Sequence, residues 1–167
     1  MACRGMHSAI TAEQRAHLEA LPDGEERYFY LDDIYEELGD DYQQHMDKSW
    51  DAIHRCLTQS PPGEALLDTA AGSYPLKLAI IGGKELSQDP SYLLYLIEPN
   101  DVPILAQAMA GISPERFAEL YRHHCPGYAP EFGDEDLEYS FAYFEELRDF
   151  LARMAPTGRA VVFSADQ

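Results

Sequence analysis

A tryptophan and a histidine stand four residues apart in the stretch DKSWDAIHRCLT (residues 47–58). On a helix, Trp50, Ile53, His54 and Leu57 would share one face, because residues three and four apart lie above one another. A histidine in such a place can contact a ligand or act as an acid or base. Tryptophan and histidine on an apolar face are more often core residues with backbone hydrogen bonds. The sequence therefore favours core, with a pocket around Trp50 and His54 as the alternative.

A second candidate for chemistry is the triplet His123-His124-Cys125, because all three residue types bind metals. Adjacent helical residues point about 100° apart, so three in a row do not readily converge on one ion. No second ligand pair lies at a known spacing. We interpret the histidines as residues of a last helical turn, where the dipole favours positive charge. We expect no metal and no cofactor.

Phosphate-binding and nucleophile motifs are missing. In IIGGKELS a Walker loop would need glycine at position 78 and serine or threonine at 85, but these positions hold Leu78 and Glu85. The chain has neither a GxSxG elbow nor a dinucleotide-binding glycine pattern. We therefore assign no catalytic residues, and the sequence favours a protein that is not an enzyme over an enzyme that uses Trp50 and His54.

Acidic residues dominate the charge, with 12 Lys and Arg against 30 Asp and Glu and a formal net charge of −18. Residues 23–41 hold nine acids and one base, Arg27; residues 131–149 hold eight acids and one base, Arg148. Tyrosines, which are favoured at interfaces, lie in both runs. A solvated face is the alternative. The predicted partner-binding residues are Asp32, Asp33, Glu36, Glu37, Asp40, Asp41, Asp134, Glu135, Asp136 and Glu138.

The negative net charge limits the classes of partner that the protein can bind. Nucleic acids and anionic membranes require a basic surface, so neither is expected. A basic protein would be attracted. Cys3, Cys56 and Cys125 are odd in number and far apart, which is typical of reduced thiols. The N-terminus lacks the apolar run of a signal peptide, and no stretch approaches the roughly 20 apolar residues of a membrane span. We expect a cytoplasmic protein.

The length of 167 residues predicts one domain, residues 1–167. Apolar periodicity and turn residues predict strands near 3–10, 92–97 and 159–165, and helices near 11–21, 31–42, 47–59, 101–111, 113–125 and 136–154. The expected helix starts are a capping box of Thr11 and Gln14, a cap at Asp47, and Ser113 followed by Pro114, and Gly39 is expected to interrupt the helix at 31–42. The segment 76–81 can be a strand or a helical turn. Strands separated by helices need crossover connections. We predict a layered α/β domain, a small mixed sheet flanked by helices, with helix outweighing strand.

Several of these segments are similar to a known family. DKSWDAIHRCLTQ resembles the tryptophan motif of the bacterial YfbM-like family, in which Asp-Lys-x-Trp and a helical histidine precede Leu-Thr-Gly. The matching residues are Asp47, Lys48, Trp50, His54, Leu57 and Thr58. Gln59 stands where the family has glycine. AIIGGKELS, YLLYLIEPNDVPILAQAMAGISPERFAELY and FEELRDFLARMAPTGRAVVFSA follow in the family's order. The N-terminal third matches only in a strand after RGM.

The resemblance implies a compact three-layer α/β domain, and it supplies no catalytic residues because the family is uncharacterised. The acid-rich runs are where this chain departs from it. We therefore expect a non-enzymatic acidic binding protein that occupies a basic protein partner, in the manner of an immunity protein that neutralises a bacterial toxin. The alternative is a small enzyme or ligand-binding domain that uses a pocket around Trp50 and His54.

Overall fold

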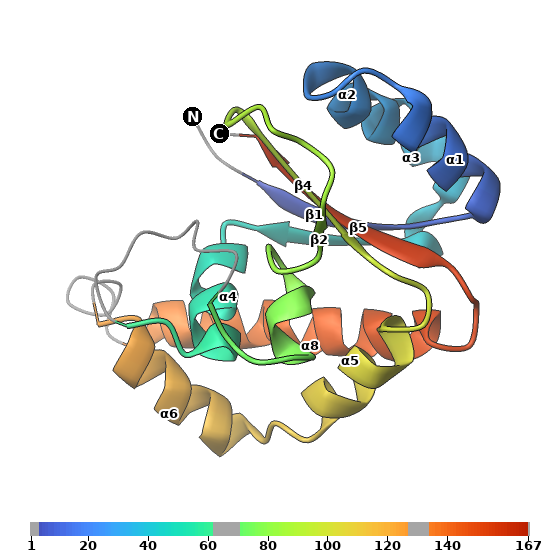
Figure 1. Ribbon diagram of the computed structural model, residues 1–167. Coiled ribbons are helices and arrows are strands. Elements are labelled where there is room, and N and C mark those ends of the chain that lie inside the picture. The colour runs from blue at the N-terminus through green and yellow to red at the C-terminus, as the bar shows by residue number, and fades with distance from the viewer. Residues whose placement is uncertain (1–3, 62–70, 127–133, 167) are drawn as a thin grey trace.

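A five-stranded sheet forms the centre of the protein. The computed structural model describes residues 4–61, 71–126 and 134–166. The strands are β1 (Gly5–Ile10), β2 (Gln43–Asp47), β3 (Lys84–Glu85), β4 (Tyr92–Ile97) and β5 (Ala160–Asp166). Their order across the sheet is β2-β1-β5-β4-β3 (Figure 1), and each neighbouring pair is antiparallel. Strand β5 lies at the centre, so both of its edges are paired, one with β1 and the other with β4.

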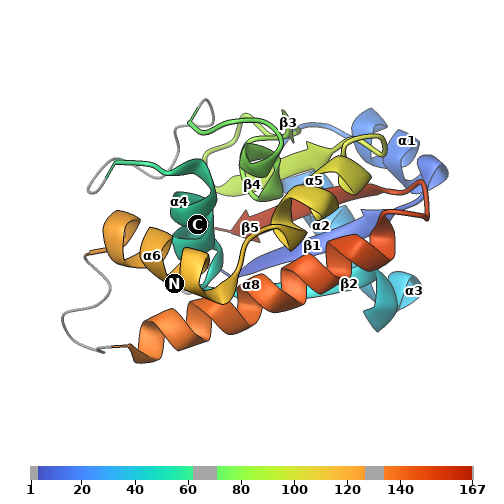
Figure 2. The ribbon, with the colours of Figure 1, turned by 90° about the horizontal axis from the view of Figure 1, so that it is seen from below.

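Helices cover both faces of this sheet. On one side lie α1 (Ala12–Ala20), α2 (Glu25–Asp33), α3 (Tyr35–Leu38) and the 3₁₀ turn η1 (Asp40–Tyr42). On the other lie α4 (Trp50–Thr58), the 3₁₀ turn η2 (Leu76–Ala79), α5 (Val102–Ala110), α6 (Pro114–His124) and α8 (Glu135–Met154). The 20-residue α8 runs the length of the sheet (Figure 2). The three-layer α/β class and the excess of helix are confirmed.

The sheet separates two hydrophobic cores, because successive side chains of a strand point to opposite faces. In β5, Val161 and Phe163 belong to the larger core, under α4, α5 and α8. Ala160 and Val162 belong to the smaller core, under α1, α2 and α3. The clearest predicted strand, YLLYLI, is β4 at residues 92–97, and its apolar run is divided between the two cores in the same way.

Two helix starts follow their sequence signals. The Thr11 hydroxyl accepts a hydrogen bond from the Gln14 N–H (3.1 Å), and the Gln14 side chain accepts one from the Thr11 N–H (2.9 Å), which completes the predicted capping box. The Ser113 hydroxyl accepts a hydrogen bond from the Arg116 N–H (3.1 Å), with Pro114 as the first helical residue. No helix within the described ranges combines the length and apolarity needed to cross a membrane.

The sheet was expected to be mixed, but the pairings among the described residues are antiparallel throughout. The reason lies in the connection from β4 to β5. After α5 and α6, the long α8 returns the chain along the sheet, so that β5 begins where β4 ends and Ile97 pairs with Val161. Helices between strands therefore do not require parallel crossovers here.

The predicted helix at 31–42 is interrupted, and a strand follows that was not predicted. Helix α2 ends at Asp33, α3 ends at Leu38 with Gly39 (φ +70°) as its C-cap, and β2 occupies residues 43–47. Asp47, expected to cap the tryptophan helix, instead ends β2 with a positive φ of 43°, and Ser49 stands at the N-cap position. A five-residue strand at the sheet edge has too little apolar pattern to show in the sequence.

Candidate functional site

Trp50 and His54 are core residues of α4. Their exposed fractions are 3% and 2%. The Trp50 ring packs on Phe163 with centroids 5.6 Å apart. A Cβ atom on Gly5 would lie 2.8 Å from Trp50 Cδ1 and 2.7 Å from Phe163 Cε2. The tryptophan therefore fills a space that leaves room for no side chain at position 5.

Burial also determines the state of His54. Desolvation lowers the pKa of His54 to about 4, so the ring is neutral at pH 7; the charge of Asp51 raises this pKa and that of Arg55 lowers it, both by smaller amounts. Its Nε2 atom has no hydrogen-bond partner among the residues that the structure describes. Asp51 and Arg55 form an ion pair (2.7 Å) on the outer side of the helix, as their spacing indicates. Neither Trp50 nor His54 lines the hollows beside α1 or the cavities next to Arg4 and Lys48.

The triplet at the end of α6 does not converge. His124 is buried and its Nδ1 lies 2.8 Å from the Ser60 carbonyl oxygen. His123 is exposed, and the Cys125 thiol points at the Ala52 carbonyl (3.6 Å). In the part of the chain that the structure describes, no group of three His, Cys, Asp or Glu side chains could hold a metal.

The second acidic run, apart from residues outside the described ranges, is largely paired within the protein. Asp134 pairs with Arg122 (3.6 Å), and Asp136 accepts a hydrogen bond from the Tyr121 hydroxyl. Further along α8, Arg148 contacts both Glu145 (3.4 Å) and Asp149 (3.1 Å), while Glu146 accepts a hydrogen bond from Gln44 (2.9 Å). Glu135 and Glu138 are exposed without such contacts among the described residues. Most of these carboxylates thus have internal partners.

The first run is different. Asp32, Asp33, Glu36, Glu37, Asp40 and Asp41 are all exposed. Among the described residues, none of these six carboxylates forms an ion pair or accepts a hydrogen bond. They lie on α2, α3 and η1, on the opposite side of the sheet from α8 (Figure 1). The structure therefore does not bring the two predicted runs together into one surface.

Two adjoining hollows lie between α1 and the α2–α3 segment. They measure about 570 and 380 Å³ and share His17 and Tyr30, whose rings are 4.7 Å apart. We call the two together the acidic groove. Its lining residues are Thr11, Glu13, Gln14, His17, Leu21, Glu25, Glu26, Phe29, Tyr30, Asp33, Ile34 and Glu37. The groove thus has an aromatic floor and five carboxylates around it.

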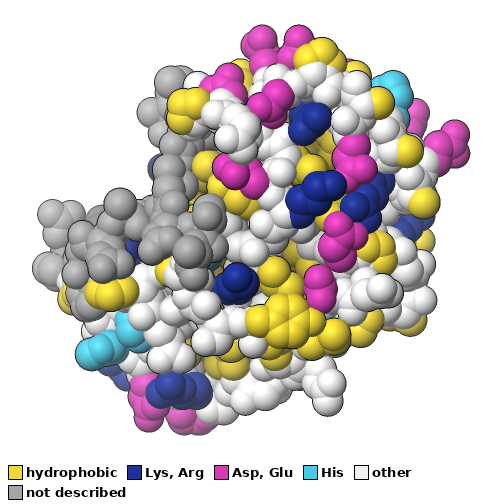
Figure 3. Space-filling model, viewed as in Figure 1, with side chains coloured by type: hydrophobic (Ala, Val, Ile, Leu, Met, Phe, Trp, Pro, Cys, Tyr) yellow, Lys and Arg dark blue, Asp and Glu magenta, His cyan; other side chains and the backbone are white. Residues whose placement is uncertain are grey.

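The electrostatics of the groove are negative. Burial, followed by the charges of Glu37 and Glu13, raises the pKa of the Tyr30 hydroxyl. Phe29 is 47% exposed, and its ring contacts Tyr28 at 5.7 Å. Over α2, at the top of the molecule in Figure 3, acidic and apolar side chains lie next to each other. A cation would meet carboxylates and aromatic rings there at the same time.

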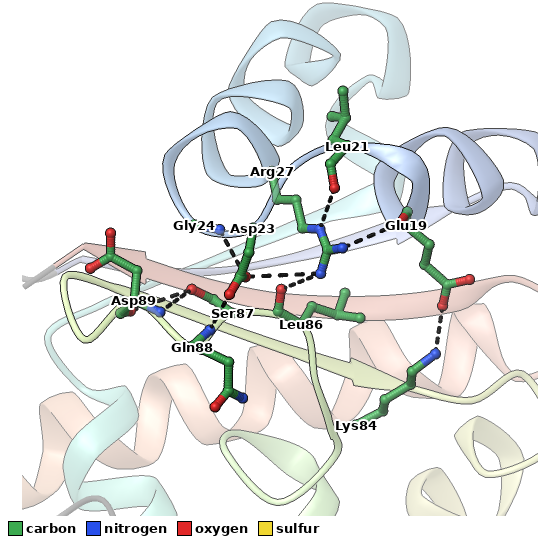
Figure 4. Close-up of polar contacts among 10 residues, drawn as sticks. All are labelled: Glu19, Leu21, Asp23, Gly24, Arg27, Lys84, Leu86, Ser87, Gln88 and Asp89. Atoms are coloured by element: carbon green, nitrogen blue, oxygen red, sulfur yellow. Dashed lines mark hydrogen bonds and ion pairs between the residues drawn. The ribbon is translucent and has the colours of Figure 1, made fainter.

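Arg27, the only base of the first run, is directed away from the groove. Its guanidinium donates hydrogen bonds to the carbonyl oxygens of Leu21 (3.1 Å), Glu19 (3.2 Å) and Leu86 (2.6 Å), as Figure 4 shows. Two of these carbonyls belong to the end of α1, which would otherwise lack partners. Arg27 therefore joins α2 to α1 and to the β3–β4 segment, and its ion pair is with Asp23 (4.0 Å), which does not line the groove.

A second set of contacts holds the same corner. The Asp23 carboxylate accepts hydrogen bonds from the backbone N–H groups of Gly24 (2.8 Å) and Gln88 (2.9 Å). Lys84 pairs with Glu19 at 2.9 Å. These interactions position α1 and α2 on the sheet, and with them the walls of the groove.

Of the predicted binding residues, only Asp33 and Glu37 line the groove. Asp32, Glu36, Asp40 and Asp41 are exposed elsewhere on the same layer. Sequence reasoning missed His17 and Glu13, because both lie on α1 and nothing in the local pattern indicates that α1 packs beside α2. Tyr30 could be found from the sequence, because it is one of the tyrosines within the acid-rich run at residues 23–41.

Comparison with known proteins agrees with the fold. The structure of YfbM from Escherichia coli, a protein of unknown function, is similar with a TM-score of 0.69 at 17% sequence identity, covering 97% of this chain and 99% of that chain. This likeness shows the fold alone. No curated protein matches. The family model described as "Domain of unknown function (DUF1877)" matches residues 1–164. The resemblance to YfbM-like proteins is confirmed, and the chain belongs to the DUF1877 family.

Proposed function

We propose that this protein is a non-enzymatic binding protein whose acidic groove occupies a basic protein partner. The observation that carries the proposal is the set of exposed carboxylates around Tyr30 and Phe29 between α1 and α2, among which Asp33 and Glu37 form no ion pair with any described residue. The second acidic run does not take part, because it lies across the sheet and is largely paired.

The partner chemistry follows from the groove. A lysine or arginine side chain placed over Tyr30 or Phe29 would gain a cation–π interaction, and neighbouring carboxylates such as Glu26 would accept its hydrogen bonds. Tyrosines at such a place are frequent anchors of interfaces. The surrounding negative field would accelerate encounter with a basic protein.

We propose that the partner is a toxin of the same bacterium, and the protein its immunity factor. Such a partner must be occupied quickly and held tightly, and charge complementarity at close pairs supports both. The net charge of −18 also suits a protein that captures a basic enzyme.

The test compares two charge-reversed proteins with the wild type. One carries Glu26→Lys, Asp33→Lys and Glu37→Lys at the groove. Its matched control carries Asp134→Lys, Glu135→Lys and Glu138→Lys at the start of α8, so that the net charge changes equally. All three are used as baits in native-cell lysate, and captured proteins are identified by mass spectrometry. We expect the groove variant to lose a basic protein that wild type and control retain.

Association and dissociation rates measured with the captured protein then distinguish direct contacts at the groove from long-range electrostatic attraction. Screening acts beyond about 8 Å at physiological salt, so both variants should associate more slowly, and by similar amounts. Only the groove variant should also dissociate faster, because it alone loses direct contacts. Equal dissociation rates in the two variants would place the partner elsewhere and refute the proposal.

A further inference from the structure

Two cysteines that stand far apart in the sequence meet in the larger core. Cys56 lies on α4 and Cys125 is the C-cap residue of α6, and their exposed fractions are 0% and 1%. Both are free thiols, and Cys3 lies outside the described residues. We propose that Cys56 and Cys125 form a redox-sensitive pair, which hydrogen peroxide converts into a disulfide that ties the end of α6 to α4. The pair lies across the sheet from the acidic groove, so the proposal is independent of that groove.

The packing of α6 on α4 places the two thiols together. The Cys125 thiol donates a hydrogen bond to the Ala52 carbonyl oxygen, with Sγ 3.6 Å from that oxygen. In an α-helix the same oxygen accepts the backbone N–H four residues later in the chain, which is the N–H of Cys56. Cys125 Sγ therefore lies beside the helical turn that carries the Cys56 side chain. A side-chain hydrogen bond joins the two thiols directly.

The electrostatic surroundings of the thiols agree with this contact. The hydrogen bond to Cys125, followed by burial, raises the pKa of the Cys56 thiol above its usual value. Burial and the hydrogen bond to Asp136 raise the pKa of the Tyr121 hydroxyl, and Cys125 and Cys56 both add smaller contributions. The two sulfur atoms thus lie near the same hydroxyl. Because Cys56 stays protonated at neutral pH, it is not the thiol that an oxidant attacks first.

The position of Cys125 in the fold makes it the first thiol to meet an oxidant. Cys125 stands at the end of a helix, whereas Cys56 lies within one. Helix ends open at a lower free energy than the rest of a core helix. The Cys125 backbone N–H donates to the Tyr121 carbonyl (2.8 Å), and loss of this last turn of α6 exposes Cys125 while α4 stays folded. Oxidation is therefore limited by this local opening.

The reaction consumes one hydrogen peroxide molecule and needs no other reactant. The Cys125 thiolate attacks one peroxide oxygen, so that an S–O bond forms and the O–O bond breaks. The hydroxide that leaves takes up the proton released by the thiol and becomes water. When the end of α6 closes again, Cys56 Sγ attacks the sulfur of this sulfenic acid, the S–S bond forms and the S–O bond breaks. The leaving hydroxide takes the Cys56 proton as a second water, and two electrons have passed from the sulfurs to the peroxide.

The test treats the reduced, full-length protein with hydrogen peroxide, which catalase then removes. The protein is unfolded in urea, its remaining thiols are blocked with N-ethylmaleimide, and its peptides are mapped by mass spectrometry without reduction. We expect a linked peptide pair that joins Cys56 to Cys125 and is lighter than the two separate peptides by two hydrogen atoms. The matched control Cys3→Ala should give the same linked pair, and Cys125→Ala should give none. Blocked thiols at both residues, a link to Cys3, or a sulfinic acid at either residue would refute the proposal.

Thermal melting shows whether the disulfide ties the two helices in the folded protein. Oxidised Cys3→Ala should melt at a higher temperature than the same protein reduced, because a bond between residues far apart in the sequence restricts the unfolded chain. Dithiothreitol should restore the lower melting temperature. The rise should be absent when Cys125→Ala is added to Cys3→Ala, a control that also reports any effect of methionine oxidation. An oxidised Cys3→Ala protein that melts no higher than the reduced one would overturn the proposed tie between α6 and α4.

Discussion

The two acid-rich segments have nearly the same composition, and the protein uses them differently. On α8 the carboxylates mostly have partners, as Arg148 shows by contacting both Glu145 and Asp149. On α2 and α3, Asp32, Asp33, Glu36 and Glu37 have none among the described residues, while the one base, Arg27, binds backbone carbonyls and Asp23. A run of acids can thus be part of the stabilising framework or an available surface.

The difference coincides with the two faces of the sheet. The α4–α5–α8 face holds the larger core, with Trp50 and the rings of Phe117 and Phe144. The α1–α3 face holds a smaller core and carries the exposed Phe29 together with the acidic groove. We infer that stability resides mainly in the first face and that binding is the role of the second.

The largest effect should come from Trp50. Trp50→Ala should lower the free energy of unfolding by about 3–5 kcal/mol, the range for deleting a buried large aromatic side chain. Phe29→Ala on the other face should cost less than about 1 kcal/mol, because the ring is already half exposed. Urea denaturation measures both. Similar losses in the two variants would contradict the assignment of stability to the α4–α8 face.

Acid should destabilise the larger-core face through its buried histidines. Burial lowers the pKa of His7 and of His54 from 6.5 to about 4. Between these values the unfolded chain binds more protons, so stability falls as the pH falls from about 6.5 towards 4. Each histidine should cost about 2 kcal/mol between about pH 7 and pH 5.

His54→Gln, whose side chain does not titrate, tests this dependence. Its unfolding free energy should fall less steeply with acid than that of the wild type, by about 2 kcal/mol over the same interval. The same substitution at the exposed His123 serves as the control for losing an imidazole. Parallel curves for His54→Gln and wild type would show that His54 is not desolvated.

The single bases of the two runs provide a closer comparison. Arg27→Met should lower stability by about 1–2 kcal/mol, since it leaves the carbonyls of Leu21, Glu19 and Leu86 without their donor. Arg148→Met should cost less than about 1 kcal/mol, because its pairs with Glu145 and Asp149 are at the surface. Thermal melting of both variants measures the two losses of stability. A larger loss at Arg148 would reverse the proposed roles of the two bases.

The smallest predicted effect on the free energy of unfolding is an increase, whereas the preceding substitutions lower it. Replacing Glu26, Asp33 and Glu37 by Gln, Asn and Gln should raise stability by a few tenths of a kcal/mol, because like charges repel and these three have no internal partner. Asp136→Asn should instead lower it by about 1 kcal/mol through the weakened bond to Tyr121. Chemical denaturation at low salt gives the sharpest comparison. A groove variant that loses stability would show that these acids are structural.

Local signals in the sequence determined much of the framework. The capping box of Thr11 and Gln14, the Ser113-Pro114 start and the apolar run of β4 each act within a few residues, so pattern alone located α1, α6 and β4. The helical stripe around Trp50 predicted burial in the same way. Motif order indicated the family. Composition predicted an acidic surface but not its shape.

Only the tertiary structure decided which acids are available. The groove needs His17 of α1 beside Tyr30 of α2, and that contact depends on Arg27 reaching the Leu86 carbonyl 59 residues away. The direction of β5 depends on the path of α8, and the edge strand β2 depends on pairing with β1. Periodicity describes what one element buries. It carries no information on which elements meet, because packing partners are selected by the whole chain.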